Sequence, residues 1–215
     1  MKVIQRLNAL RQGDDAYLNM LLDNHTKYPN SFTDVWLATA YGFPTMQTHA
    51  KYARDAAYAA KRFRSHGIGV ALQLSNSIGH GQYMLARDCS AVEQELKYAQ
   101  PIVGHDGTTG VCSFCYNDPV FRAYTLEEVR LYMEAVEPEE FWIDDDFRAR
   151  NHKPVDFGCF CPRCMSAFNA RFGTAYTREE LVKDMIPDAS LRGKWVEFLR
   201  QGLASLMTEI CAVAT

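Results

Sequence analysis

The 215-residue sequence contains no apolar run close to the roughly 18 residues that a membrane-spanning helix needs. Its first ten residues include Gln5, Arg6 and Asn8, at the positions where a secretory signal peptide has its apolar stretch. The chain also lacks tandem repeats and low-complexity linkers. We therefore expect a cytoplasmic protein that does not bind a membrane and that folds as one domain.

An excess of basic residues is absent as well. The sequence has 23 Lys and Arg residues against 26 Asp and Glu residues, a formal net charge of -3. A nucleic-acid partner and a polybasic lipid-binding segment are therefore not expected. The hydrophobic fraction of 47% excludes an intrinsically disordered chain. A chain of this length buries roughly 70% of its unfolded surface, so it needs no disulfide bonds in order to fold.

Short apolar runs alternate with amphipathic stretches along the chain, which is typical of βαβ units. Strands are predicted at residues 3–7, 34–40, 68–74 and 141–145. Helices are predicted at residues 15–27, 46–66, 119–136 and 162–172, from residue 177 onward, and at residues 191–213. Gly67 and Gly173 end two of these helices, and Pro119 begins another. Thr177 and Glu180 form a capping-box pattern at the start of the fifth.

This alternation predicts an α/β fold: a parallel (βα)₄ half of a TIM-type barrel, with a cysteine-rich zinc-binding insertion. A complete barrel needs eight units and about 250 residues. Residues 1–215 are therefore interpreted as the N-terminal portion of a single (βα)₈ barrel domain whose remaining strands lie outside this chain. An open doubly wound sheet of four strands fits the same periodicity.

Two further expectations follow from this architecture. A half-barrel leaves strand edges and apolar surface uncovered, so we expect a homo-oligomer or a C-terminal half that covers them. Residues 76–118 are unusually long for a connection in a compact domain, so we expect them to carry function or a small substructure.

Five of the seven cysteines lie in two clusters. Cys159, Cys161 and Cys164 follow the fourth predicted strand with C-x-C-x-x-C spacing. In a reducing compartment such clusters bind metal more often than they form disulfides, and tetrahedral zinc takes four sulfur or nitrogen ligands. The candidates for a fourth ligand from a distant segment are Cys115, Cys112, His152 and His105. Cys89 and Cys211 stand apart and are expected to be ordinary thiols.

Three aspartates, Asp144, Asp145 and Asp146, end the fourth predicted strand. The carboxyl ends of parallel strands face the ligand crevice of an α/β sheet, so we expect these side chains to take part in chemistry. Crowded carboxylates raise at least one pKa, as a general acid requires. The alternative is a solvated acidic loop that is neutralised by Arg148 and Arg150 or by a divalent ion.

These segments resemble the family 42 glycoside hydrolases, which are β-galactosidases. The sequence WIDDDF at residues 142–147, CFCPRC at 159–164, Phe168 and RFG at 171–173 are similar, in this order, to that family's I-D-N-E-F, C-x-C-x-x-C, F and R-Y-G. Upstream, CYNDPVFR at residues 115–122 looks like the family's C-x-x-S-P-x-Y-R. The resemblance covers about residues 110–175. It implies a (βα)₈ barrel, retaining glycoside hydrolysis by two glutamates, and a structural zinc ion.

The resemblance also implies roles for individual residues. Its zinc ligands would be Cys115, Cys159, Cys161 and Cys164. Asp146 matches the position of the family's acid/base glutamate and Asp145 that of the preceding asparagine, whereas the family's nucleophile lies on a later strand outside this chain.

The position of residues at the strand ends adds further candidates. Asp144 completes the predicted catalytic group. The predicted substrate contacts are Tyr41, Asn76, His80 and Arg148, together with Phe43. Because a residue at a strand's carboxyl end contributes mainly to function, we expect Asp146→Asn to keep the fold.

The first hypothesis is therefore a glycoside hydrolase that cleaves O-glycosidic bonds of a carbohydrate substrate, with a retaining mechanism in the complete barrel and no activity in this chain alone. The alternative is a non-catalytic carbohydrate-binding or scaffold module with a structural zinc ion. A metal-dependent hydrolase that uses the aspartates and His152 is disfavoured, because the nearby cysteines suit a closed zinc site and no His-x-His pair exists.

Overall fold

The computed structural model describes the whole chain, residues 1–215. Its main sheet has four parallel strands in the order β1 (Ile4–Arg6), β2 (Asp34–Ala38), β3 (Gly69–Leu74) and β6 (Glu140–Ile143). Each strand lies at a predicted position, so the α/β class and the parallel sheet are confirmed. Since all four strands run in one direction, their carboxyl ends lie at one edge of the sheet, which we call the carboxyl edge.

Six α-helices accompany the strands. They are α1 (Asp15–Lys27), α2 (Met46–Arg64), α3 (Pro119–Val136), α4 (Pro162–Phe172), α5 (Arg178–Met185) and α6 (Ala189–Ala214). The bounds of α1, α3 and α4 are as predicted. Side-chain caps fix several helix starts: Asp14 accepts a hydrogen bond from the first turn of α1, and Asp118 accepts two from the first turn of α3. The predicted capping box at Thr177 is present at α5.

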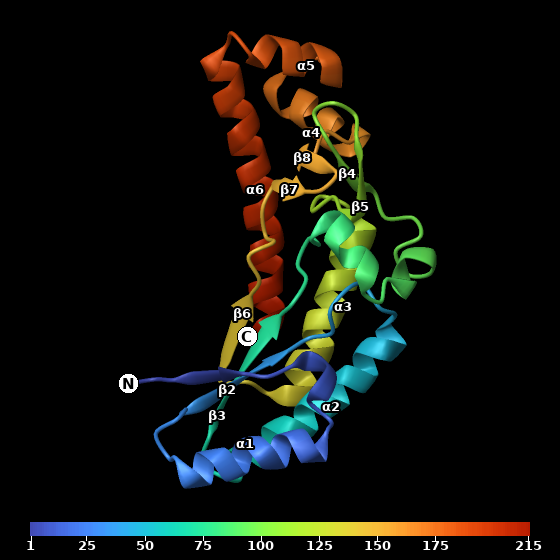
Figure 1. Cartoon of the computed structure of the whole chain (residues 1–215). Coiled ribbons are helices and arrows are strands. Elements are labelled where there is room, and N and C mark those ends of the chain that lie inside the picture. The colour runs from blue at the N-terminus through green and yellow to red at the C-terminus, as the bar shows by residue number, and fades with distance from the viewer.

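The strand order follows the chain order, without the reversal that characterises a doubly wound sheet. Helices α1, α2 and α3 lie along one face of the sheet (Figure 1). Leu37, Phe63 and Leu72 belong to the hydrophobic core on that face. Because side chains alternate along a strand, Trp36 and Trp142 lie on the opposite face, which we call the open face. The edge strands β1 and β6 each have one neighbour, so both ends of the sheet are unpaired.

A second group of elements lies at the other end of the molecule from α1 (Figure 1). It contains two antiparallel hairpins, β4 (Pro101–Val103) with β5 (Thr109–Phe114) and β7 (Arg150–His152) with β8 (Val155–Phe157). The first hairpin and two short 3₁₀ helices, η2 (Gly81–Ala86) and η3 (Ser90–Glu93), form the small substructure predicted for residues 76–118.

The hairpins, α4 and α5 share a hydrophobic core with α6. Trp195 of α6 stacks on Phe160, with ring centroids 4.4 Å apart, and also contacts Phe168 of α4 at 5.0 Å. From there α6 runs beside α3 (Figure 1). It therefore packs against both the hairpin core and α3.

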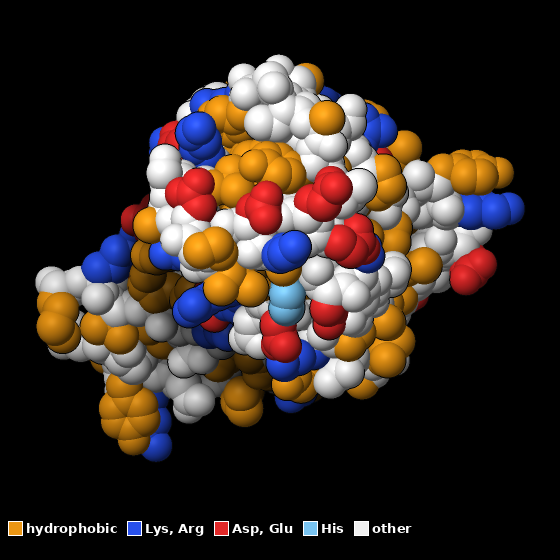
Figure 2. All heavy atoms as spheres, turned by 90° about the horizontal axis from the view of Figure 1, so that it is seen from above, with side chains coloured by type: hydrophobic (Ala, Val, Ile, Leu, Met, Phe, Trp, Pro, Cys, Tyr) orange, Lys and Arg blue, Asp and Glu red, His pale blue; other side chains and the backbone are white.

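The end of the molecule around α5 is shown in Figure 2. Acidic, basic and hydrophobic side chains are interleaved on this face. Ile186 and Val196 are exposed and border a hollow of about 160 Å³. This face therefore offers no continuous basic patch to a nucleic acid. None of the helices in the structure combines the length and the apolar character needed to span a membrane.

Candidate functional site

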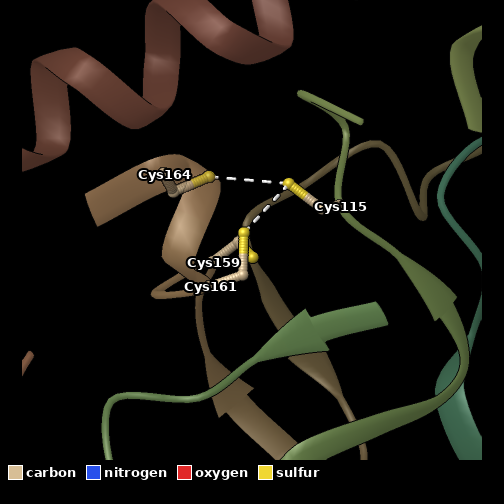
Figure 3. A group of neighbouring side chains, drawn as sticks. All are labelled: Cys115, Cys159, Cys161 and Cys164. Carbon is tan, nitrogen blue, oxygen red and sulfur yellow. Dashed lines mark hydrogen bonds between the residues drawn. The ribbon is translucent and has the colours of Figure 1, made fainter. Parts of the chain in front are cut away.

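Four cysteines from three segments meet in the interior of the second core (Figure 3). Cys115 directly follows β5, Cys159 lies just after β8, Cys161 precedes α4, and Cys164 is in its first turn. The Cys115 sulfur lies 3.5 Å from that of Cys164 and 3.7 Å from that of Cys161. All four sulfurs lie within 4.8 Å of one another, and all four residues are fully buried.

This geometry fits a tetrahedral metal ion. An ion with metal–sulfur bonds of about 2.3 Å holds its sulfurs about 3.8 Å apart, close to the spacing observed here. The Asn117 amide donates a hydrogen bond to the Cys164 sulfur at 3.4 Å, as groups outside the ligand set do for metal-bound thiolates. The four residues are those that the family resemblance implied. Of the alternatives left open, Cys112, His105 and His152 do not belong to the group.

The four thiols perturb one another strongly. The sulfurs of Cys159, Cys161 and Cys164, together with burial, raise the pKa of the Cys115 thiol above its usual range. The pKa of Cys161 is lowered, first by its contact with Cys115. Several buried thiolates in one place require a compensating cation. With four sulfur ligands, such an ion has no open position for water, so the cluster is suited to a structural role.

The side chain of Asp146 does not face the crevice as predicted. It is fully buried, and its two carboxylate oxygens accept hydrogen bonds from the backbone N–H groups of Ser77, Ile78 and Gly79 and from the Ser77 hydroxyl. The shortest of the backbone bonds, from Gly79, is 2.7 Å. Asp146 therefore fixes the loop after β3. A carboxylate saturated in this way is poorly placed to give a proton to a substrate, because every acceptor position is already used.

Asp144 and His80 lie side by side at the carboxyl edge. The His80 Nε2 lies 3.3 Å from Asp144 Oδ2, and the Gln73 amide donates to Asp144 Oδ1 at 3.0 Å. About a quarter of each side chain of the His80–Asp144 pair is exposed. Burial is the largest single influence and acts to raise the pKa of Asp144. The hydrogen bonds from His80 and from the Asp145 backbone N–H, with the charges of His80 and Arg6, together outweigh burial and lower this pKa. The hydrogen bond to Asp144 raises the pKa of His80. Asp144 is therefore partly accessible and ionised at neutral pH, whereas Asp146 is enclosed.

Of the remaining predicted site residues, three are at least partly exposed, namely Tyr41, Asp145 and Arg148. Asp145 is exposed and interacts with Arg148, whose guanidinium donates to the Asp145 carbonyl at 2.7 Å. Tyr41 is half-buried, and Arg6 donates to its hydroxyl at 3.4 Å. The other predicted contacts, Asn76 and Phe43, are buried. The Asn76 amide donates to the carbonyls of residues 40 and 42, so it holds the loop after β2 and does not face a ligand.

His152 also has a structural position. It is fully buried, with Nδ1 2.5 Å from the Gly79 carbonyl oxygen and Nε2 2.6 Å from that of Arg148. Both ring nitrogens are thereby occupied, and His152 is not available as the metal ligand considered from the sequence. Together with Asp146 it fixes the segment that ends at His80.

Sequence reasoning missed the residues of the open face. Trp36 and Trp142 lie 5.4 Å apart between ring centroids, and the Arg6 guanidinium is 5.6 Å from the Trp36 ring. The alternation of residues 34–38 and 141–145 could have identified them, because it separates both tryptophans from the core-facing Leu37 and Phe141. This face continues upward to Gln73 and Asp144 at the carboxyl edge.

A buried polar network supports the loop after β2 from the helix side. The His49 ring lies 2.9 Å from the Tyr124 hydroxyl, which donates to the Pro44 carbonyl. Glu128 is buried beside them, with one carboxyl oxygen lacking a hydrogen-bond partner. Burial raises the pKa of Glu128 to about 8 and lowers that of His49 to about 4. Both groups are therefore neutral at pH 7.

Comparison with known proteins adds no identification. No protein-family model matches this chain, and no curated protein matches it.

Replacing Asp146 with Asn should destabilise the protein, contrary to the expectation from the sequence. The asparagine amide keeps one oxygen but directs its own N–H donors at the backbone N–H donors of the loop. The free energy of unfolding should therefore fall by about 3 kcal/mol. Urea denaturation measures this change. Asp145→Asn is the matched control, since its exposed side chain should alter the unfolding free energy by less than about 0.5 kcal/mol. Equal effects of the two substitutions would contradict the anchoring role.

Glu128→Gln should stabilise the protein increasingly as the pH rises. The pKa of Glu128 in the folded state, about 8, exceeds the ordinary value of 4.5, so the folded wild type keeps a proton that the unfolded chain loses. The unfolding free energy of the wild type therefore decreases as the pH rises from about 4.5 to about 8. The glutamine variant has no such proton. Its advantage in unfolding free energy should therefore grow from pH 5 to pH 8, while the exposed-neighbour control Glu127→Gln shows no trend. A difference independent of pH would refute this assignment.

Proposed function

We propose that this protein is a carbohydrate-active hydrolase of the barrel type, related to the family 42 glycoside hydrolases, and that it acts on O-glycosidic bonds. The observation that carries the proposal is the accessible Asp144–His80 pair at the carboxyl edge of a parallel sheet. In barrel enzymes this edge holds the active site. The four-cysteine cluster that follows the same strand supports the family relationship, since the resemblance includes both motifs in this order.

The sheet supports the barrel part of the proposal. Strands in chain order with helices on one face are the arrangement expected of four consecutive barrel units, and β1 and β6 have free edges with which further parallel strands could pair. Trp36 and Trp142 on the open face would then lie inside the barrel, beneath the substrate site. In this account the additional strands cover the open face and bring the second carboxylate that glycoside hydrolysis requires.

The side chains at the carboxyl edge suit a carbohydrate. Asp144, held ionised by His80, would accept hydrogen bonds from sugar hydroxyls and would stabilise the positive charge that develops at the anomeric carbon. Tyr41 and Arg148, which are both partly exposed, would add an aromatic surface and hydrogen-bond donors. Asp146 acts through the loop that carries His80, and not on the substrate itself.

A non-catalytic carbohydrate-binding module is the second candidate. It is favoured by one specific observation, namely that Asp146, at the position of the family's acid/base residue, is enclosed by four hydrogen-bond donors. Under this alternative the edge binds sugar but does not cleave it.

For the four-cysteine cluster we propose zinc as the metal. Four thiolates around a tetrahedral position are a typical structural zinc set, and such an ion contributes to folding on the order of 10 kcal/mol. It would cross-link the segments after β5 and β8 to the start of α4.

Activity should depend on Asp144. On the product of the complete reading frame, Asp144→Asn should lower hydrolysis of a suitable glycoside by about 10²-fold or more, because it removes charge from the reacting centre. Asp156→Asn, which changes an exposed aspartate of β8 paired with Lys153, is the control and should have wild-type activity. A panel of aryl and unactivated glycosides, read by product release, provides the measurement. Sugar binding without turnover would select the binding module, and an active Asp144→Asn variant would refute the role of this residue.

Zinc content should follow the cysteine cluster. Protein purified without added metal should contain one zinc ion per chain by elemental analysis, and Cys164→Ser should lose it and melt at a lower temperature. Cys211→Ser, which changes an exposed thiol of α6, should keep the full zinc content. Zinc-free wild-type protein with an unchanged melting temperature would contradict a structural metal.

A further inference from the structure

A second group of metal-binding side chains lies at the carboxyl edge, apart from the cysteines. One ligand atom each from His80, Asp144 and Asp145 lies within 4.8 Å of the other two. The His80 Nε2 and Asp144 Oδ2 are 3.3 Å apart. An octahedral ion with bonds of about 2.1 to 2.4 Å separates neighbouring ligands by about 3.0 to 3.4 Å. The His80–Asp144 pair therefore already has the spacing of two adjacent ligands.

Gln73 provides an independent indication of a missing ligand. Its side chain is 4% exposed, and its carbonyl oxygen Oε1 has no hydrogen-bond partner. The other end of the same amide donates to Asp144 Oδ1 at 3.0 Å, so the amide lies against the acidic group. A half-turn of the terminal amide exchanges its oxygen and nitrogen. This turn would direct Oε1 to the Asp144 carboxylate, where only a cation between them makes the contact favourable.

The supporting structure holds His80 in place from behind. Asp146 binds the backbone N–H groups of the preceding loop, and His152 contacts the Gly79 carbonyl. His80 therefore projects from a loop that is fixed on two sides, whereas Asp144 and Asp145 directly follow β6. Arg148 is the nearby competing cation, 3.4 Å from Asp145 Oδ2. Since Asp145 is 80% exposed, this side chain can rotate away from Arg148 toward the other two ligands.

We propose that His80, Asp144 and Asp145 form a divalent-cation site at the carboxyl edge, with Gln73 Oε1 as a further ligand. Mn²⁺, Mg²⁺ and Ca²⁺ prefer oxygen ligands to thiolates, so this group of one nitrogen and several oxygens suits them better than the four-cysteine cluster does. His80 and Asp144 are about a quarter exposed and Asp145 is 80% exposed, so the remaining coordination positions are open to solvent and take water or neighbouring hydroxyl groups of a bound polyol. Only this last statement rests on the proposed function. Cation binding itself follows from the side chains.

Titration with Mn²⁺, read from the electron paramagnetic resonance signal of the free ion, tests the site. Mn²⁺ prefers oxygen and nitrogen ligands, so the cysteine cluster does not interfere. The full wild-type chain should bind one Mn²⁺ with a Kd below about 1 mM. Asp144→Asn and His80→Gln should each weaken binding at least about tenfold, and Asp156→Asn should bind as the wild type does. Absence of binding at 1 mM, or equal binding by Asp144→Asn, would overturn the proposal.

Weaker Mn²⁺ binding by a variant could also result from misfolding, so a variant that is expected to bind Mn²⁺ more tightly provides a second test. Gln73→Glu adds a carboxylate beside Asp144, which destabilises the metal-free protein by charge repulsion and improves the cation site. Mn²⁺ should therefore raise the melting temperature of Gln73→Glu more than that of the wild type. An equal or smaller rise would count against Gln73 as a ligand and against the site. Mn²⁺ binding by this chain, together with no glycoside turnover by the product of the complete reading frame, would leave the cation site standing and refute the hydrolase. Glycoside turnover that a chelator does not affect, in a protein that does not bind Mn²⁺, would support the hydrolase and refute the cation site.

Discussion

Four buried sulfur atoms provide the constraint on which the upper half of the molecule depends. They come from the ends of two hairpins and from the start of α4, and Cys115 is more than forty residues away from the other three cysteines in the chain. The surrounding hairpins are short, with strands of three to six residues, and two-stranded hairpins of this size have little stability of their own. The stacked rings of Phe160 and Trp195 add a hydrophobic core, and an ion shared by the four cysteines would tie the two hairpins to one another.

This constraint reaches the carboxyl edge through the chain. The segment between Asp146 and Cys159 contains the β7–β8 hairpin, and its His152 contacts the Gly79 carbonyl in the loop before His80. Asp146 binds the same loop from the other side. The position of His80 next to Asp144 is therefore set by contacts on both flanks, one of which comes from the hairpin that leads into the cysteine cluster. Metal binding and the geometry of the candidate site are expected to be coupled for this reason.

The sequence predicts those features that arise from local patterns. Turn signals and apolar periodicity locate the four parallel strands, the helix at Asp15–Lys27 and the capping box at Thr177, because each depends on residues close in the chain. The cysteine spacing predicts three ligands, and the family resemblance implies the fourth. The short hairpins β4–β5 and β7–β8 escape prediction, since strands of three residues carry no measurable alternation and are stabilised by their tertiary contacts.

The roles of the aspartates could not be read from their order. Asp144 and Asp146 are two residues apart, and alternation alone would direct both to the same side. The strand ends at Ile143, however, and the chain turns so that Asp146 meets the N–H groups of residues 77–79. Unpaired backbone donors in a buried loop are costly, and a carboxylate is the side chain that accepts most of them at once. Asp146, the predicted proton donor, is thus buried against this loop, and Asp144 and His80 form the partly exposed pair at the carboxyl edge.

The proposed metal centre can be tested directly by one measurement. X-ray absorption at the zinc edge, recorded on protein purified without added metal, reports the number and type of the nearest ligand atoms. Four sulfur neighbours at about 2.3 Å are the expected result for Cys115, Cys159, Cys161 and Cys164. A first shell with nitrogen or oxygen in place of one or more sulfurs, or a protein without bound metal, would contradict it.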